Sequence, residues 1–254
     1  MRYSSLLILP TLAFMAPACN KSSGGRKNLI FESGFEGSNY LAGWTNDQHC
    51  CDYSIQQSSE VAREGNNSLR LEVRSTDALV SNSIRSELTL PGITDQGEMW
   101  YGLSLYFKDW IPDHAASSEL QWHPASSGGS SVMSLRTTNG EYEFVHGSDA
   151  TGFTYGQVPA QYRTVVPNVW VDLVFHIKWA SGNTGQIQVW KDGIQVYNSQ
   201  GIRTDFDGQY LKVGINAFAW SQGITDIATA RIFFIDNVRI GNSKATYEDV
   251  RPGN

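Results

Sequence analysis

Apolar and polar residues alternate at every second position in several stretches of the chain, which is the period of a half-buried β-strand. In residues 68–74, for example, Leu69, Leu71 and Val73 share one face and polar residues occupy the other. The same period predicts strands over the ranges 84–90, 100–107, 170–179, 186–197, 210–218 and 231–240. No segment longer than one or two turns shows a helical period, so the pattern predicts an all-β protein.

The range 186–197 contains Asp192-Gly193 near its middle, a pair that favours a two-residue hairpin turn. Strands at this spacing, joined by long polar loops, favour two antiparallel sheets that pack face to face. In such a sandwich the outer face of one sheet is often concave. The strands of a groove carry polar and aromatic residues where strands facing the core carry Val or Leu.

Three predicted strands have such polar residues on one face. Because side chains two positions apart point the same way, each strand presents a row of them. If the strands are neighbours, the rows converge on one surface, with Gly214 leaving space between the residues of the third row. The rows are Arg85 and Glu87, then Gln121 and His123, then Tyr210, Lys212 and Asn216.

These residue types suit β-elimination from a uronic-acid polymer. The sugar C5 proton is weakly acidic because the adjacent carboxylate is negative, so that charge must be neutralised, which Arg and Gln can do. A neutral His is suited to remove the proton near neutral pH. A Tyr hydroxyl can protonate the leaving glycosidic oxygen. This chemistry requires no metal cofactor.

Several segments resemble those of the jelly-roll polysaccharide lyases. Three look like the signature strands of alginate lyases: Arg85-Ser86-Glu87-Leu88, Gln121-Trp122-His123 and Tyr210-Leu211-Lys212-Val213-Gly214. Three more resemble the heparin lyase I and glucuronan lyase group: Trp100–Phe107, Val189–Gly193 and Phe234–Gly241. The resemblance implies a concanavalin A-like β-jelly roll with a concave substrate groove. It also implies a lyase that cleaves an anionic polysaccharide by β-elimination and leaves unsaturated uronate ends.

By this resemblance Arg85 and Gln121 would hold the substrate carboxylate, and His123 would be the base or a neutralising partner. The family usually has a Tyr as catalytic acid where this chain has Asn216. Either another Tyr serves as the catalytic acid, or His123 acts as both base and acid, or the chain has lost its activity. Tyr210 is the nearest candidate for the acid, and further tyrosines could reach over the groove: Tyr142, Tyr155 and Tyr162. The remaining expected substrate contacts are Glu87, Lys212, Asn216, Trp122 and Tyr162, and Trp220 is a second candidate for stacking on sugar rings.

Other interpretations of the same residues stay open. Arg85 and Glu87 could form an ion pair on a solvated face, and His123, beside Pro124, could lie in a loop. A non-catalytic surface protein that binds glycans would also use such a groove, and Asn216 favours that alternative. A glycoside hydrolase would need two carboxylates facing each other across the groove. Glu87 has no obvious carboxylate partner in the sequence.

The net charge of the chain narrows the classes of molecule that it could bind. The 254-residue chain has a formal net charge of −6, which argues against general nucleic-acid binding. A locally basic groove could still take an anionic polysaccharide. We expect a monomer.

In related carbohydrate-active jelly rolls, acidic residues of the first and last strands hold a structural Ca²⁺, for which the candidates here are Glu32, Glu36 and Asp236.

The first residues have the features of an export signal. Arg2 precedes the apolar stretch Leu6–Phe14, which is too short to span a bilayer. Ala16–Cys19 resembles the bacterial lipobox, although Ala16 stands where Leu is usual. We therefore expect residues 1–19 to be a lipoprotein signal with a lipidated Cys19, 20–27 a flexible tether and 28–254 a single domain. The expected location is the outer membrane, periplasm or cell surface, with simple secretion as the alternative.

The two remaining cysteines, Cys50 and Cys51, are adjacent in the sequence. They could be free thiols or form a disulfide between neighbours. Their spacing matches no metal-binding motif.

Overall fold

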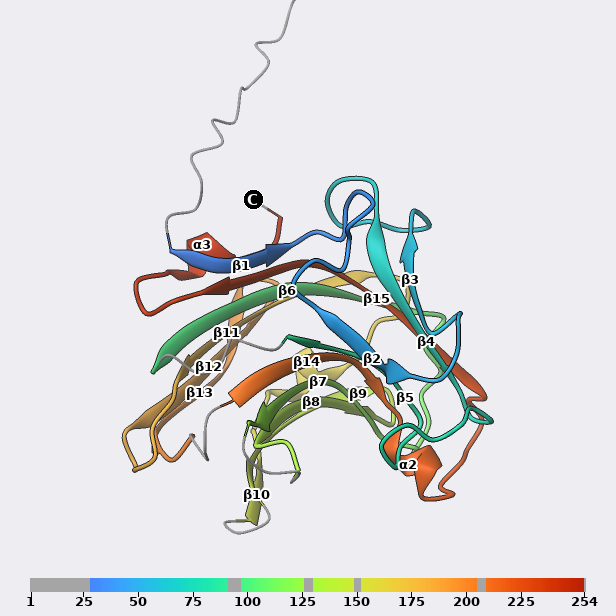
Figure 1. Ribbon diagram of the computed structural model, residues 1–254. Coiled ribbons are helices and arrows are strands. Elements are labelled where there is room, and N and C mark those ends of the chain that lie inside the picture. Colours follow the sequence, from blue (N-terminus) through green and yellow to red (C-terminus); the bar gives the residue numbers. More distant parts are fainter. Residues whose placement is uncertain (1–27, 91–96, 126–129, 149–151, 205–208, 254) are drawn as a thin grey trace, which may run out of the picture.

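The computed structural model describes residues 28–90, 97–125, 130–148, 152–204 and 209–253. Two antiparallel sheets pack face to face, and both curve in the same direction (Figure 1). The predicted all-β jelly roll is therefore confirmed. The predicted signal, the lipidated Cys19 and the tether lie outside the described residues and stay predictions.

One sheet has eight strands. Its spatial order is β13 (Ile194–Ile202), β12 (Gly185–Lys191), β11 (Trp170–Lys178), β6 (Glu98–Lys108), β15 (Ala230–Gly241), β4 (Ser68–Arg74) and β3 (Ile55–Ser58), with β1 (Leu29–Ser33) paired to β15. The two strands at its centre, β6 and β15, are also its longest. This sheet forms the convex back of the molecule.

The second sheet has seven strands. Its order is β10 (Gly152–Tyr155), β9 (Glu141–Ser148), β8 (Met133–Thr138), β7 (Ser117–Pro124), β14 (Gln209–Asn216), β5 (Arg85–Leu90) and β2 (Thr45–His49). Three single-turn helices complete the described elements: α1 (Ala160–Arg163), α2 (Phe218–Ser221) and α3 (Tyr247–Val250). None of the helices in the described ranges has the length and apolar character needed to cross a membrane.

The predicted strands match observed ones because alternation reports which side of a sheet faces the core. The hairpin turn between β12 and β13 is also confirmed, since Asp192 and Gly193 have positive φ values of 49° and 81°. Both residues adopt left-handed conformations, as a type I′ turn requires. Alternation did not predict β1, β2, β3, β8, β9 and β10, and β7 was expected only from its Gln121-Trp122-His123 motif. Four of these strands, β1, β2, β3 and β10, have only four or five residues, too few to show a clear period.

The hydrophobic core fills the space between the two sheets. Leu103, Leu105 and Phe107 of β6 face it from the convex side, and Leu120 and Trp122 of β7 face it from the other. The Trp122 ring makes edge contacts with Tyr101 and Phe175 at centroid distances of 5.4 and 5.0 Å. Trp122 has 0% of its surface exposed, so it anchors the sandwich and cannot stack on a sugar.

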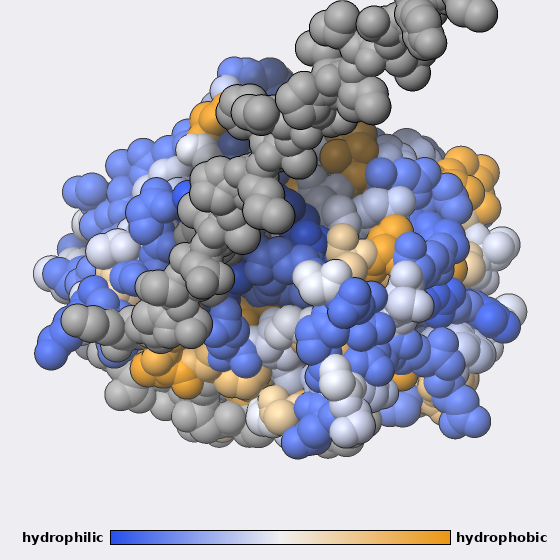
Figure 2. All heavy atoms as spheres, turned by 90° about the horizontal axis from the view of Figure 1, so that it is seen from above, coloured by the Kyte–Doolittle hydropathy of each residue, from blue (hydrophilic) through white to orange (hydrophobic). Residues whose placement is uncertain are grey.

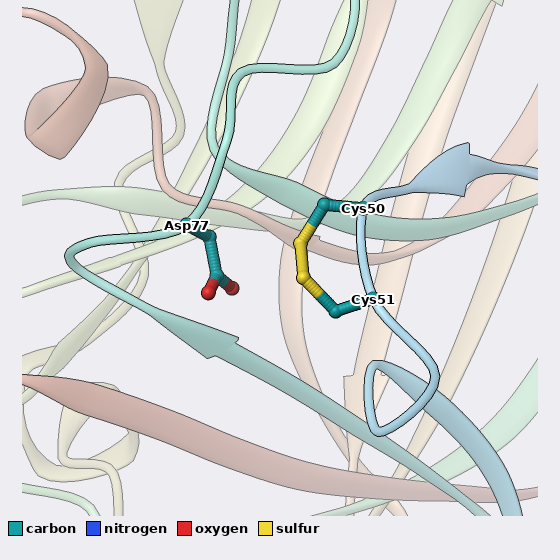
Figure 3. Close-up of side chains that lie close together, drawn as sticks. All are labelled: Cys50, Cys51 and Asp77. Carbon is teal, nitrogen blue, oxygen red and sulfur yellow. A yellow bond between two sulfur atoms is a disulfide. The ribbon is translucent and has the colours of Figure 1, made fainter.

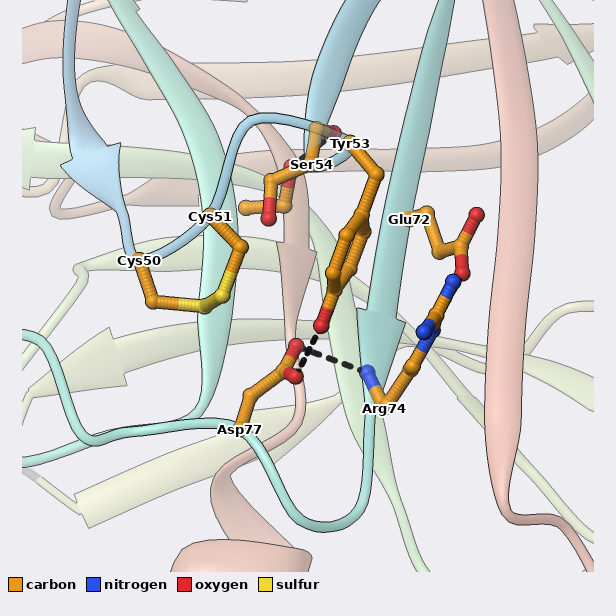
Figure 4. Close-up of a disulfide and its surroundings, with 8 residues drawn as sticks. Cys50, Cys51, Tyr53, Ser54, Glu72, Arg74 and Asp77 are labelled. Carbon is orange, nitrogen blue, oxygen red and sulfur yellow. Dashed lines mark hydrogen bonds and ion pairs between the residues drawn. A yellow bond between two sulfur atoms is a disulfide. The ribbon is translucent and has the colours of Figure 1, made fainter.

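Cys50 and Cys51 are joined to each other by a disulfide in the turn after β2 (Figure 3). Asp77 lies beside the two sulfurs, but disulfide sulfur is not the thiolate that metals require. Asp77 instead accepts hydrogen bonds from the Tyr53 hydroxyl and, at 2.8 Å, from the Arg74 backbone amide (Figure 4). These contacts fix the segment between β2 and β3.

The face above the eight-stranded sheet carries mostly hydrophilic side chains where it is visible in Figure 2. Hydrophobic residues appear there only in small separate groups, as on ordinary soluble surfaces. The residues of the predicted chemistry lie on the other side of the molecule.

We expect Trp122→Ala to lower the free energy of unfolding by about 3–5 kcal/mol, because it empties a fully buried site between the sheets. Urea denaturation followed by tryptophan fluorescence measures this. Trp170→Ala, at a partly exposed position on the convex sheet, is the matched control and should cost clearly less. Equal losses in the two variants would contradict the assignment of Trp122 to the core.

Candidate active site

A groove with a volume of about 740 Å³ crosses the outer face of the seven-stranded sheet. Side chains from β2, β5, β7, β8, β14 and the α2 region line it, and most of them are polar. The lining residues are Thr45, Gln48, Ser81, Arg85, Thr89, Ser118, Gln121, His123, Ser130, Ser131, Arg136, Tyr210, Lys212, Asn216, Phe218 and Gln222.

The three strands with polar rows are direct neighbours in the order β7, β14, β5. Backbone pairing aligns Tyr210 with His123 and Lys212 with Gln121 across β7 and β14. The residue paired with Asn216 on the other side is Arg85. The predicted convergence of the three rows is therefore present, and His123 belongs to a strand rather than to a loop.

Glu87 is the centre of this arrangement. Its carboxylate accepts hydrogen bonds from the amide of Gln121, and from Lys212 Nζ and Arg85 Nη1 at 3.1 Å each. Only 1% of the Glu87 side chain is exposed, so the pair with Arg85 is not on a solvated face. Because one buried carboxylate binds all three donors, it fixes the positions of side chains from three strands.

The prediction that Glu87 contacts substrate is thus wrong: the residue lies beneath the groove surface. Its buried charge requires partners, since an unpaired ionised carboxylate in a protein interior is strongly unfavourable. Glu87 is a positioning residue for Arg85, Gln121 and Lys212.

Gly214 makes the contact across β14 sterically feasible. It pairs with Glu87, and its φ of +147° is a conformation that side-chain-bearing residues rarely adopt. A Cβ there would lie 2.2 Å from the Ser86 carbonyl oxygen and 2.4 Å from Glu87 Cα. Glycine is therefore needed for β5 and β14 to approach this closely.

A bulge in β7 lies close to these residues. The pairing of β7 with β8 shifts between Ser118 and Leu120, so that Ser118 lines the groove while Glu119 turns toward the interior. Glu119 accepts hydrogen bonds from Ser117 and Thr137, and its burial raises the pKa of its carboxyl to about 8. Glu119 thus offers no carboxylate to the groove.

His123 is held in its neutral form. Burial, with a further contribution from the positive charge of Lys212, lowers the pKa of His123 to about 4. The ring of Tyr210 stacks beside it, with centroids 5.8 Å apart and planes 26° apart. Among the described residues that line the groove, Tyr210 is the only tyrosine.

Several predicted substrate contacts lie elsewhere. Trp122 and Trp220 are both buried in the core. For Trp122 the reason is the strand period, because the alternation that turns Gln121 and His123 outward turns Trp122 inward. Tyr162 lies on α1 and packs against the core, away from the groove lining. Tyr142 is buried, and Tyr155 is exposed on β10 but also outside the lining.

Ten of the lining residues did not come from the sequence motifs, and two of these are of chemical interest: Arg136 on β8 and Phe218 on α2. The Arg136 guanidinium carbon lies 5.4 Å from the centre of the Phe218 ring, and its Nε donates to the Ser134 hydroxyl at 3.0 Å. The alternation of Met133 and Leu135 with Ser134 and Arg136 was the available signal for a groove-facing strand.

The predicted calcium ligands bind protein N–H groups instead. Glu36 accepts three hydrogen bonds from Asn66 and Asn67, and Asp236 accepts backbone amides of Arg63 and Glu64 at 2.8 and 3.1 Å. Glu32 pairs with Arg239 at 3.0 Å, completing a set of occupied carboxylates. These carboxylates are already hydrogen-bonded within the protein, and the structural calcium stays a prediction.

Comparison with known proteins decides the family. The family model described as polysaccharide lyase matches residues 36–239, which is most of the chain. The chain belongs to the polysaccharide lyase family. No curated protein matches the chain significantly.

Solved structures share the fold of this lyase. The endo-β-1,4-glucuronan lyase of the fungus Trichoderma reesei is 22% identical with a TM-score of 0.65, over 83% of this chain and 98% of that one. The alginate lyase A1-II′, of polysaccharide lyase family 7, is 14% identical with a TM-score of 0.58, over 81% and 96%. The cellulose-induced protein Cip1 is 12% identical with a TM-score of 0.61, over 83% and 96%.

The groove of this lyase does not suit a glycoside hydrolase. Hydrolysis of a glycosidic bond by the usual route needs two carboxyl groups that flank the bond. The described lining residues include neither Asp nor Glu, and they include the cations Arg85, Arg136 and Lys212.

We expect Gly214→Ala to lower both the melting temperature and the rate of polysaccharide cleavage, the latter at least about tenfold, because β5 must move and carry Arg85 and Glu87 with it. Calorimetry and a cleavage assay measure the two effects. Gly182→Ala is the matched control, since a Cβ there meets nothing within 4 Å. A Gly214→Ala protein with the stability and activity of the wild type would contradict this account.

Proposed function

We propose that this lyase cleaves a uronic-acid polysaccharide by β-elimination. The observation that carries the proposal is the concentration of positive charge in the groove. The whole chain has a formal net charge of −6, yet the groove has three cationic side chains and a single carboxylate, Glu87, beneath its surface. Such a groove attracts an anionic polymer, whereas the net negative charge of the chain disfavours binding of that polymer elsewhere on the surface.

Arg85 and Gln121 would neutralise the carboxylate of the reacting sugar. Arginine presents five N–H donors, and Arg85 uses Nη1 on Glu87 and Nη2 on the Ser81 carbonyl, at 3.1 and 3.2 Å. The guanidinium is therefore fixed before substrate arrives. Lys212, held by the same carboxylate, adds positive charge where the enolate-like intermediate would gain negative charge.

His123 would remove the C5 proton. A base must be unprotonated to act, and the lowered pKa of His123 keeps its ring neutral at neutral pH. The neighbouring cations that lower this pKa also favour the approach of an anionic sugar.

Tyr210 would donate a proton to the leaving glycosidic oxygen. It lies beside His123 in the groove, on the strand that positions Lys212. Asn216 stands at the usual Tyr position and accepts a hydrogen bond from the Ser83 hydroxyl at 2.5 Å. An amide cannot supply the proton that a phenol supplies, so in this chain the acid would come from six residues earlier on the same strand, where Tyr210 pairs with the base His123.

Two of the related structures fit this substrate class by name, one as a glucuronan lyase and the other as an alginate lyase. We further propose that the protein is exported and anchored by a lipid on Cys19, because the lipobox-like residues directly follow an apolar stretch of signal-peptide length.

The wild-type protein should release unsaturated uronate ends from at least one uronic-acid polymer. Absorbance of the unsaturated product, followed with glucuronan, alginate and heparin-type polymers, measures this. His123→Ala and Arg85→Ala should each lower the rate by at least about 100-fold, since each removes a group that acts in proton transfer or charge stabilisation.

Lys178→Ala, on the opposite sheet, is the control for loss of one positive charge and should retain wild-type rates. Wild-type rates in both groove variants would reject the assigned site. Polymer binding without any product would instead support the non-catalytic glycan-binding alternative, which Asn216 favours.

The activity should persist well below neutral pH. Because the pKa of His123 is lowered to about 4, the neutral base is present above that value and is lost as the pH falls through it. NMR titration of the imidazole, assigned by comparison with His123→Gln, should show a neutral ring at about pH 6. A midpoint near the ordinary value of 6.5 would contradict the burial of this ring.

A further inference from the structure

A second cation lies in the groove at a fixed distance from the reaction centre. Backbone pairing connects Arg136 of β8 to Ser118 of β7, Ser118 to Asn216 of β14, and Asn216 to Arg85 of β5. All four residues line the groove. They therefore form one row that crosses four strands, with an arginine at each end.

The two guanidinium groups are anchored at opposite ends of this row. Adjacent strands are about 4.8 Å apart, so three steps across the sheet separate the Cα atoms of the two arginines by about 14 Å, which exceeds the length of a pyranose ring. Arg85 is held by Glu87 and the Ser81 carbonyl, and Arg136 is held by Ser134 on its own strand. If Arg85 neutralises the reacting sugar, Arg136 faces another sugar of the same polymer chain.

The Arg136 side chain is held in a position that suits the binding of a planar anion. Its guanidinium lies over the Phe218 ring, and its Nε is held by Ser134. Phe218 is itself packed against the core, so the stack is anchored from below. A guanidinium restrained in this way loses little conformational entropy on binding a carboxylate.

The cationic part of the groove ends at this arginine. The residue paired with Arg136 on the next strand is Glu143, and Glu141 lies two positions before it on the same strand. The charge of the sheet therefore changes from positive on β5, β14 and β8 to negative on β9. Along this row of the described sheet, the positive charge therefore ends at Arg136.

We propose that Arg136 binds the carboxylate of a second uronate, so that the preferred substrate carries at least two acidic sugars within the span of the groove. This inference rests on the proposed function, because it takes Arg85 as the site of the reacting uronate. It makes Arg136 and Phe218 determinants of specificity rather than of the chemical step. A polymer with isolated uronates would fill only the Arg85 position.

Calorimetric titration in an inactive His123→Gln background tests the proposal without cleavage. The two ligands are a tetrasaccharide made only of uronates and a tetrasaccharide of equal length with a single uronate. Arg136→Gln should raise the Kd for the first ligand about tenfold, the usual effect of losing one hydrogen bond to a charged group. It should leave the Kd for the second ligand unchanged within about twofold.

Two further variants separate the effect of the planar Arg136 stack from the effect of net charge. Arg136→Lys keeps the charge but loses the planar stack, and should give an intermediate Kd for the all-uronate ligand. Lys178→Gln, on the opposite sheet, should change neither Kd and so controls for net charge. Unchanged melting temperatures confirm that the variants fold.

Equal changes in Kd for both ligands, or no change for either, would overturn the role of Arg136. Failure of the proposed function would look different: the wild-type protein would release no unsaturated product from any polyuronate, whatever the effect of Arg136→Gln on binding.

Discussion

Burial of one carboxylate determines the geometry of the groove. An ionised side chain that is 99% covered loses its hydration, and the protein must replace that hydration with hydrogen bonds and opposite charge. For Glu87 the replacement comes from Arg85, Gln121 and Lys212. The same contacts that make Glu87 tolerable in the interior therefore align three groups that line the groove. Groups aligned before substrate binds need little reorganisation during the reaction, which is the main source of electrostatic catalysis.

This arrangement depends on the order of strands rather than on the sequence near any one residue. The donors belong to β5, β7 and β14, which are far apart along the chain and adjacent only in the folded sheet. β14 lies between the other two, so Gln121 must reach Glu87 across it. Because a Cβ at Gly214 would clash with the backbone of β5, glycine there keeps β14 and β5 close enough for that contact. The hydrophobic core on the opposite face of the same strands, including Trp122 and Leu88, keeps the sheet in register.

Much of the fold could be predicted because alternation of apolar and polar residues directly reports which face of a strand is buried. The same rule could have placed Trp122 in the core, since its neighbours Gln121 and His123 face outward. The bulge at Glu119 breaks the period, so no pattern on β7 could have predicted that Ser118 lines the groove. Arg136 was missed because it belongs to no family motif, and Tyr162 was misplaced because loop sequences do not encode where a segment docks.

The two described ends of the chain lie on the same side of the molecule, beside β1 and α3 and behind the convex sheet (Figure 1). The groove opens on the opposite side. Residues 28 and 253 are therefore both on the side of the molecule away from the groove. A support or carrier attached at either end would leave the whole width of the groove accessible, even to polymers too large to diffuse freely.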